Sequence, residues 1–138
     1  MNCLFCKIAN KQIQAEIVYE DAAALAILDL HPRSPGHTMI LPKVHAINLL
    51  ELPEEQVGLV FLTVQKVTAI LQKALQPQGF TIGINHGVIS GQTVSHLHIH
   101  VMPRFEGDKG GTIHSVVNNP SSESLPAMAE KIRKAQSH

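Results

Sequence analysis

The chain has 138 residues, 44% hydrophobic and 16% charged, which excludes a disordered protein and suits one domain over 1–138. Eleven basic and eleven acidic residues give a formal net charge of zero, which argues against a nucleic-acid-binding surface. No apolar run approaches the roughly 20 residues of a membrane span, and the N-terminus lacks the pattern of a signal peptide. We therefore expect a cytoplasmic protein without a membrane partner.

The first part of the chain is predicted to form a short helix or turn and three strands. The helix or turn covers residues 3–9, and apolar runs over 17–19 and 24–28 predict two strands. A loop over 31–36 follows, because its two prolines break regular pairing. A third strand is expected over 38–41, where a proline ends it.

The clearest element is a long helix over 53–75. Apolar residues recur at helical spacing along it, at Val57, Val60, Phe61, Val64, Val67, Leu71, Ala74 and Leu75. Pro53 suits the first turn, Glu54 suits the positive end of the helix dipole, and Pro77 suits the end. This pattern predicts one apolar face packed on the core.

The remaining chain is predicted to form a fourth strand over 80–84, a polar loop over 85–92 and a fifth strand over 94–102 that a proline ends. Residues 107–124 are rich in Gly, Asn, Ser and Pro and are expected to be irregular, before an amphipathic helix over 125–136. Strands gathered around one long helix indicate an α+β fold, with an antiparallel five-stranded sheet covered on one face.

Three histidines alternate with apolar residues in the predicted fifth strand. Alternate side chains of a strand share one face, so His96, His98 and His100 form a row while Leu97 and Ile99 face the core. Such a row is compatible with a polar surface, with a catalytic metal site, or with nucleophilic attack by one imidazole.

The loop before this row favours a phosphate-binding site. Gly91 allows close approach of the backbone, and Gln92, Thr93 and Ser95 supply side-chain donors. A neutral imidazole is a competent nucleophile toward phosphorus near neutral pH. The pattern is also that of an ordinary strand entry, so it does not decide the chemistry on its own.

The stretch from His96 to Met102 resembles the signature of the histidine triad (HIT) family, in which histidines alternate with apolar residues. The likeness runs in family order over residues 3–104 and includes Asn85-His86-Gly87 and Leu41-Pro42-Lys43-Val44-His45. It is greatest to the bacterial members of the branch that contains purine nucleoside phosphoramidases. The resemblance implies a HIT-like fold and a homodimer in which the long helix and central strands meet a partner.

The resemblance also implies a role for each matching residue. His98 matches a nucleophile that takes the nucleotidyl group before water releases a nucleoside monophosphate. His100 matches a group that bonds phosphate or leaving-group oxygens, and His37 matches a histidine that supports the nucleophile. The implied substrate-binding residues are Asp29 for the ribose, Asn85, Gly91, Gln92 and Thr93 for the phosphate, and Phe5, Ile8 and Ile27 for the base. The implied substrate is a purine nucleotide, and no organic cofactor is expected.

Cys3 and Cys6 form a Cys-x-x-Cys pair, which in a reducing compartment is typical of a metal clip or a redox pair. Within the resemblance, His45 and His96 fall where bacterial relatives place histidine ligands, so a structural zinc with a closed Cys₂His₂ set is expected. The alternative is a reduced pair without metal. In the zinc interpretation His96 is a metal ligand, and His98 is not bound to metal and can act as the nucleophile.

Three other functions remain open at this point. One is a dinucleoside polyphosphate hydrolase of the same fold, because loops and the tail build the leaving-group side. Another is a nucleotide-binding regulatory protein, against which the intact His98, Thr93 and Gln92 argue. The third is a zinc-dependent hydrolase that uses all three histidines as ligands.

Overall fold

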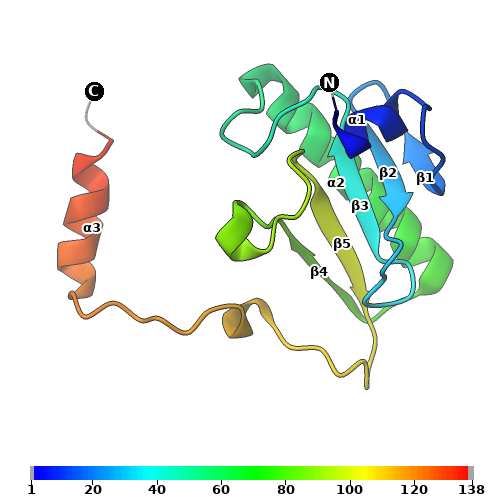
Figure 1. The fold of residues 1–138 in the computed structure, drawn as a ribbon. Coiled ribbons are helices and arrows are strands. Elements are labelled where there is room, and N and C mark those ends of the chain that lie inside the picture. Colours follow the sequence, from blue (N-terminus) through cyan, green and yellow to red (C-terminus); the bar gives the residue numbers. More distant parts are fainter. Residues whose placement is uncertain (1, 137–138) are drawn as a thin grey trace.

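The computed structural model describes residues 2–136, so residues 1, 137 and 138 of the expected domain lie outside the described range. The elements are α1 (Leu4–Ala9), β1 (Ile17–Glu20), β2 (Ala24–Leu28), β3 (Thr38–Pro42), α2 (Glu54–Leu75), β4 (Gly79–Gly83), β5 (Ile99–Arg104) and α3 (Leu125–Lys134), with 3-10 turns at Val88–Ser90 and Ile113–Ser115. The strands form one antiparallel sheet in the order β1-β2-β3-β5-β4 (Figure 1). The predicted α+β fold, with its long helix and C-terminal helix, is confirmed.

Both faces of the sheet are covered, although the sequence predicted cover on one face only. Ala24 and Ala26 of β2 pack with α2 residues, while Leu25 and Ile27 pack with Phe5 beneath α1. A strand with an apolar residue at every position is typical of burial on both sides. The short α1 therefore supplies the second layer over part of the sheet, on the side opposite α2 (Figure 1).

α2 packs on the sheet through Val60, Thr63, Val64, Val67 and Leu71. Its N-cap is Pro53, and Gln76 ends it in the left-handed region with φ 53°. By length and composition α2 could also cross a membrane, although the sequence pattern predicted no membrane span. In this fold, its buried side contacts the sheet.

The fifth strand differs from the prediction at both ends. Its ladder begins at Ile99, because the N–H of His96 donates to the carbonyl of Val94 at 2.8 Å and closes a tight turn just before it. It also continues through Pro103, because β3 flanks only residues 99–101 and leaves the proline beside a single neighbouring strand. The predicted strand over 94–102 is therefore wrong over 94–98.

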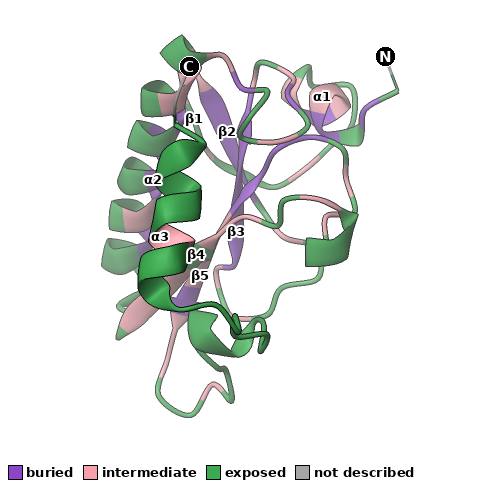
Figure 2. Ribbon diagram, turned by 90° about the vertical axis from the view of Figure 1, so that its left-hand side faces the viewer, coloured by how far each residue is buried: buried purple, intermediate pink, exposed green. Residues whose placement is uncertain are grey.

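Residues 105–136 leave the sheet after Arg104 (Figure 1). They run away on the β4 side, and α3 stands apart from the sheet. Figure 2 shows this segment as almost wholly exposed, in contrast to the buried strands. The fold therefore positions its histidines without help from its own C-terminal segment.

Candidate active site and metal site

Two cysteines from the start of the chain and two histidines from later loops converge beside α1. Sγ of Cys3 lies 3.4 Å from Nδ1 of His96, and Sγ of Cys6 lies 3.2 Å from Nδ1 of His45. The two Nδ1 atoms are 3.1 Å apart, and all four ligand atoms lie within 4.8 Å of one another. Tetrahedral zinc bonds of about 2.3 Å to sulfur and about 2.0 Å to nitrogen place ligand atoms roughly 3.3–3.8 Å apart. The group fits that geometry.

The surroundings of the group orient its ligand atoms. Nε2 of the fully buried His96 donates to the carbonyl of Pro42 at 2.9 Å, which turns the lone pair of Nδ1 toward the sulfurs. Burial lowers the pKa of His96, which keeps its ring neutral. Burial and the hydrogen bond with Cys3 raise the pKa of the Cys6 thiol to about 11. A bound cation would reverse that shift, because metal ligation favours the thiolate.

His98 lies on the α1 side of the sheet and is 7% exposed. Its Nδ1 is 2.8 Å from the carbonyl oxygen of His96, and its ring meets Phe5 edge-on with centroids 5.0 Å apart. A carbonyl only accepts, so Nδ1 carries the proton, and in the neutral ring Nε2 keeps its lone pair. Nε2 bonds to no residue among 2–136, so it is available as a nucleophile.

His37 and His100 form a second, connected histidine pair. The backbone N–H of Arg33 donates to Nδ1 of His37 at 3.1 Å, so Nε2 of His37 carries the proton of the neutral ring. That proton is donated to Nδ1 of His100, 2.9 Å away, which leaves the other proton of the pair on Nε2 of His100. His100 therefore presents an N–H donor beside His98, whose ring centroid lies 5.0 Å away. His37, expected to support the nucleophile, bonds to His100, which lies beside His98.

The environment keeps this pair neutral near pH 7. Burial lowers the pKa of His37, although the charge of Asp29, whose Oδ2 lies 3.5 Å from Nε2, opposes the shift. Burial, together with His98 and His37, lowers the pKa of His100 to about 4. The pair thus presents a neutral hydrogen-bond donor and not an imidazolium charge.

Asp29, His37 and His100 also bring their ligand atoms within 4.8 Å of one another. A metal on Nε2 of His37 would move that ring's proton to Nδ1, where it would oppose the N–H of Arg33. The proton pattern therefore argues against a metal here. Because His98 belongs to neither ligand group of the described chain, the three-histidine metal hydrolase has no support in the geometry.

The predicted phosphate loop folds back beside this site. Gly91 adopts φ +101°, which favours glycine, and a Cβ added there would lie 3.7 Å from Nδ2 of Asn85. The backbone N–H groups of Thr93, Val94 and Ser95 make no hydrogen bond within residues 2–136. Free successive amides of this kind can hold an anion.

Gln92 has a bracing role that its position in the sequence did not indicate. Its Oε1 accepts from the N–H of Gly87 at 2.9 Å, and its Nε2 donates to the carbonyls of Ile47 and Val94 at 2.7 and 3.0 Å. All of these partners are backbone groups. The side chain therefore holds the loop in shape and is not free for phosphate in this arrangement.

The expected base-pocket residues lie together where α1 packs on β2. Phe5, Ile8 and Ile27 are 4%, 6% and 3% exposed and share one apolar cluster. Asp29 follows β2 directly, and its Oδ1 accepts from the N–H of His31 at 2.9 Å, which leaves Oδ2 facing the histidine pair. The apolar cluster and the carboxylate thus border the histidines from the same side of the sheet.

Comparison with known proteins decides the family. The family model described as HIT domain matches residues 10–107. The chain belongs to the HIT family. The adenosine 5'-monophosphoramidase hnt1 of Schizosaccharomyces pombe is 35% identical over 132 residues, which cover 96% of each protein. As a HIT protein, the chain also matches known structures across its length.

A crystal structure of a HIT family member from Bacillus subtilis matches with a TM-score of 0.88 and 31% identity, covering 100% of this chain and 99% of that one. A zinc-bound histidine triad family protein from Mycobacterium smegmatis matches with a TM-score of 0.74 and 32% identity, covering 99% of both chains. The resemblance to the HIT family that the sequence indicated is confirmed. The roles of individual residues in this HIT protein stay predictions.

Proposed function

We propose that this HIT protein hydrolyses purine nucleotides at the α-phosphate through a covalent nucleotidyl intermediate on His98. The observation that carries the proposal is the bond from Nδ1 of His98 to the carbonyl of His96, because it leaves the Nε2 lone pair free. The S. pombe relative is named a monophosphoramidase, which favours an amine as the leaving group.

The reaction is a double displacement at phosphorus. In the first step Nε2 of His98 forms a bond to the α-phosphorus, the bond from phosphorus to the leaving nitrogen breaks, and the amine departs with a proton taken from water. In the second step water attacks the phosphorus, the bond to Nε2 breaks, and a nucleoside monophosphate leaves. The proton that the amine took up is returned as water adds.

The neighbouring groups suit the charge that develops on the phosphate oxygens. Nε2–H of His100 and the free N–H groups of Thr93 and Val94 are donors from the same segment of the chain as His98. Such preorganised donors stabilise the transition state more than the ground state. We assign Asp29 to the ribose hydroxyls, because its Oδ2 accepts no hydrogen bond from backbone N–H groups.

We also propose a structural zinc held by Cys3, Cys6, His45 and His96. When bound, a closed tetrahedral zinc supplies a rigid tie and no open position for catalysis. The ligand distances support this assignment, and so does the zinc-bound relative from M. smegmatis. The zinc would connect the N-terminal segment to His96, whose backbone carbonyl accepts from Nδ1 of His98.

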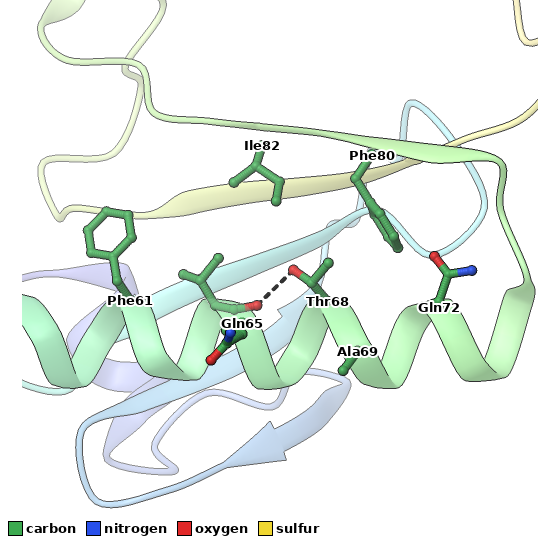
Figure 3. Close-up of a pocket in the computed structure, with 8 residues that line it drawn as sticks. Phe61, Gln65, Thr68, Ala69, Gln72, Phe80 and Ile82 are labelled. Atoms are coloured by element: carbon green, nitrogen blue, oxygen red, sulfur yellow. Dashed lines mark hydrogen bonds between the residues drawn. The ribbon is translucent and has the colours of Figure 1, made fainter.

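A third part of the proposal is a homodimer through the β4 edge and the outer face of α2. Leu59, Phe61 and Leu62 are 50%, 38% and 45% exposed on α2, and β4 lies at the edge of the sheet. A groove of about 540 Å³ runs between α2 and β4, with Phe61, Phe80 and Ile82 along it (Figure 3). Exposed apolar surface beside an unpaired strand is typical of a subunit interface.

The test is turnover of adenosine phosphoramidate. We expect release of adenylate, an increase in the mass of the chain by one adenylyl group during turnover, and loss of both in His98→Gly. His114→Gly changes an exposed histidine of the 3-10 turn at Ile113–Ser115 and should leave both intact. Full turnover by His98→Gly would overturn the proposal.

The same assay separates the alternatives. Faster cleavage of a diadenosine polyphosphate than of the phosphoramidate would favour the dinucleoside polyphosphate hydrolase. Tight adenylate binding without turnover of either substrate would favour a regulatory nucleotide-binding protein. Light scattering at micromolar concentration tests the homodimer independently of activity.

A further inference from the structure

The C-terminal arm, residues 112–136, covers nothing in its own fold. Residues 109–127 are all exposed, and α3 has no buried residue. Figure 1 shows α3 standing apart from the sheet, and Figure 2 shows both the arm and its helix as exposed. Large apolar side chains are nevertheless spread along it, including Ile113, Val116 and Leu125, which are 67%, 76% and 84% exposed.

α3 carries one apolar stripe. Leu125, Met128, Ala129 and Ile132 are spaced i, i+3, i+4 and i+7, which places them on one face of the helix. α3 has 10 residues, and isolated helices shorter than about 12–15 residues are marginal in water. We therefore expect α3 to be stabilised by packing its apolar stripe against another apolar surface.

The root of the arm is fixed by Arg104 at the end of β5. The guanidinium donates to the carboxylate of Asp108 at 2.7 Å, to Oγ1 of Thr81 at 2.9 Å and to the carbonyl of Gly111 at 2.7 Å. These bonds tie the loop before the arm to β4. The arm then leaves on the β4 side of the sheet and runs away from β1, at the opposite edge (Figure 1).

An apolar groove of about 320 Å³ lies at that opposite edge, between α2 and β1. Val18, Tyr19, Val67, Ile70 and Ala74 are among the residues that line it. Val18 and Ile70 are each 42% exposed. The arm of the same chain runs away from this groove, so the groove is open to another copy.

The distances fit a second copy joined along β4. In such a dimer the two sheets join at their β4 strands. Six strand spacings then separate β5 of one copy from β1 of the other, and at about 4.8 Å each they span about 29 Å. The 13 residues from 112 to 124 can extend over roughly 43 Å. The arm is therefore long enough to place α3 at the far edge of the partner.

We propose that α3 of each copy docks with Leu125, Met128 and Ile132 in the α2–β1 groove of a second copy. This exchange of arms rests on the homodimer proposed above, and it makes the C-terminal segment part of the subunit interface. The apolar stripe, the open groove and the direction of the arm carry the proposal independently of the catalytic chemistry.

Photo-crosslinking tests the docking directly. A benzoylphenylalanine is placed at Met128 of the full chain, and chains with normal and heavy nitrogen are mixed, unfolded and refolded together. We expect crosslinks between light and heavy chains that map to residues 17–20 or 67–75. Crosslinks within one chain would overturn the proposal, as would a dimer by light scattering that gives no crosslink to the groove. A monomer would overturn the homodimer as well, while turnover by His98 is measured separately.

Matched variants provide the second measurement, namely the rate at which a protease cuts within residues 112–124. Met128→Asp and Ile70→Asp should each speed cutting at least tenfold, because they place a charge on either side of the contact. Ala127→Asp adds the same charge at the neighbouring, exposed position of α3 and should leave the rate unchanged. Equal rates for Met128→Asp and Ala127→Asp, or no effect of Ile70→Asp, would contradict the docking. Sedimentation of the wild-type chain with anionic vesicles, lost in Met128→Asp, would assign the stripe to a membrane instead.

Discussion

The carbonyl oxygen of His96 lies 2.8 Å from Nδ1 of His98, so a single residue serves both sites. The side chain of His96 belongs to the candidate metal group, and its backbone carbonyl accepts from the proposed nucleophile. The tight turn that closes between Val94 and His96 keeps these two contacts in one short segment. The proposed zinc and the proposed nucleophile would therefore be coupled through the backbone.

Removal of the metal should weaken both stability and turnover without abolishing the chemistry. We expect Cys6→Ser to lose zinc, to lower the free energy of unfolding by roughly 3 kcal/mol, and to lower kcat several-fold with little change in KM. Zinc content, melting temperature and turnover are measured on the same preparation, with His114→Ala as a control. A folded variant without zinc that keeps full stability would contradict the structural role. A folded variant without any turnover would instead point to a catalytic metal.

The hydrogen bonds that run from the N–H of Arg33 through His37 to His100 predict slower turnover in His37→Leu. Leucine removes the donor to Nδ1 of His100, so the His100 ring loses its orientation. We expect kcat to fall about 100-fold, as misplaced catalytic groups typically cause, while KM changes little. His37→Gln retains an N–H donor and should recover part of the rate. A defect of equal size in both variants would show that the donor itself is unimportant.

The buried His100 predicts how stability depends on pH. Its pKa is about 4 in the folded chain and 6.5 as the unperturbed value, so between these pH values the unfolded chain binds a proton that the folded chain does not. Stability is therefore full above about pH 6.5 and falls as the pH drops toward 4, and His37 acts in the same direction. After allowance for partial solvent exposure, we expect a loss of about 2 kcal/mol.

Denaturant unfolding at several pH values measures this loss. His100→Gln cannot titrate and should flatten the dependence between pH 4 and 6.5. Because acid also releases zinc from thiolates, the comparison is made in the Cys6→Ser background. An unchanged slope in His100→Gln would assign the acid sensitivity to other groups.

The sequence predicted the fold and family because its signals are local and periodic. The helical spacing of Val60, Val64 and Val67 and the alternation of the histidines with Leu97 and Ile99 each specify a face. Backbone groups were not predictable in this way. The N–H of Arg33, which sets the proton on His37, and the carbonyl of Pro42, which turns His96, carry no side-chain signature.

The start of the fifth strand was missed for a related reason. Polar and apolar residues alternate from His96 to Val101, although the strand ladder begins only at Ile99. Leu97 packs in the core outside the ladder, and its N–H donates to the carbonyl of Ala46 at 2.7 Å, a loop contact that periodicity does not reveal. The bracing role of Gln92 was likewise hidden, because its partners are backbone groups and one of them, the carbonyl of Ile47, is distant in the sequence.

Asp29→Asn tests the ribose assignment with little risk to the fold. Oδ1 of asparagine can still accept from the N–H of His31, so the local turn is kept. The substitution removes the charge that would accept from two vicinal hydroxyls, a loss of charge-assisted bonds of about 1.5–3 kcal/mol. We expect KM for adenosine phosphoramidate to rise at least tenfold. The 2',3'-dideoxy analogue lacks both hydroxyls, so its KM should differ little between wild type and variant. An equal loss for the two substrates would move Asp29 from ribose recognition to the support of His37.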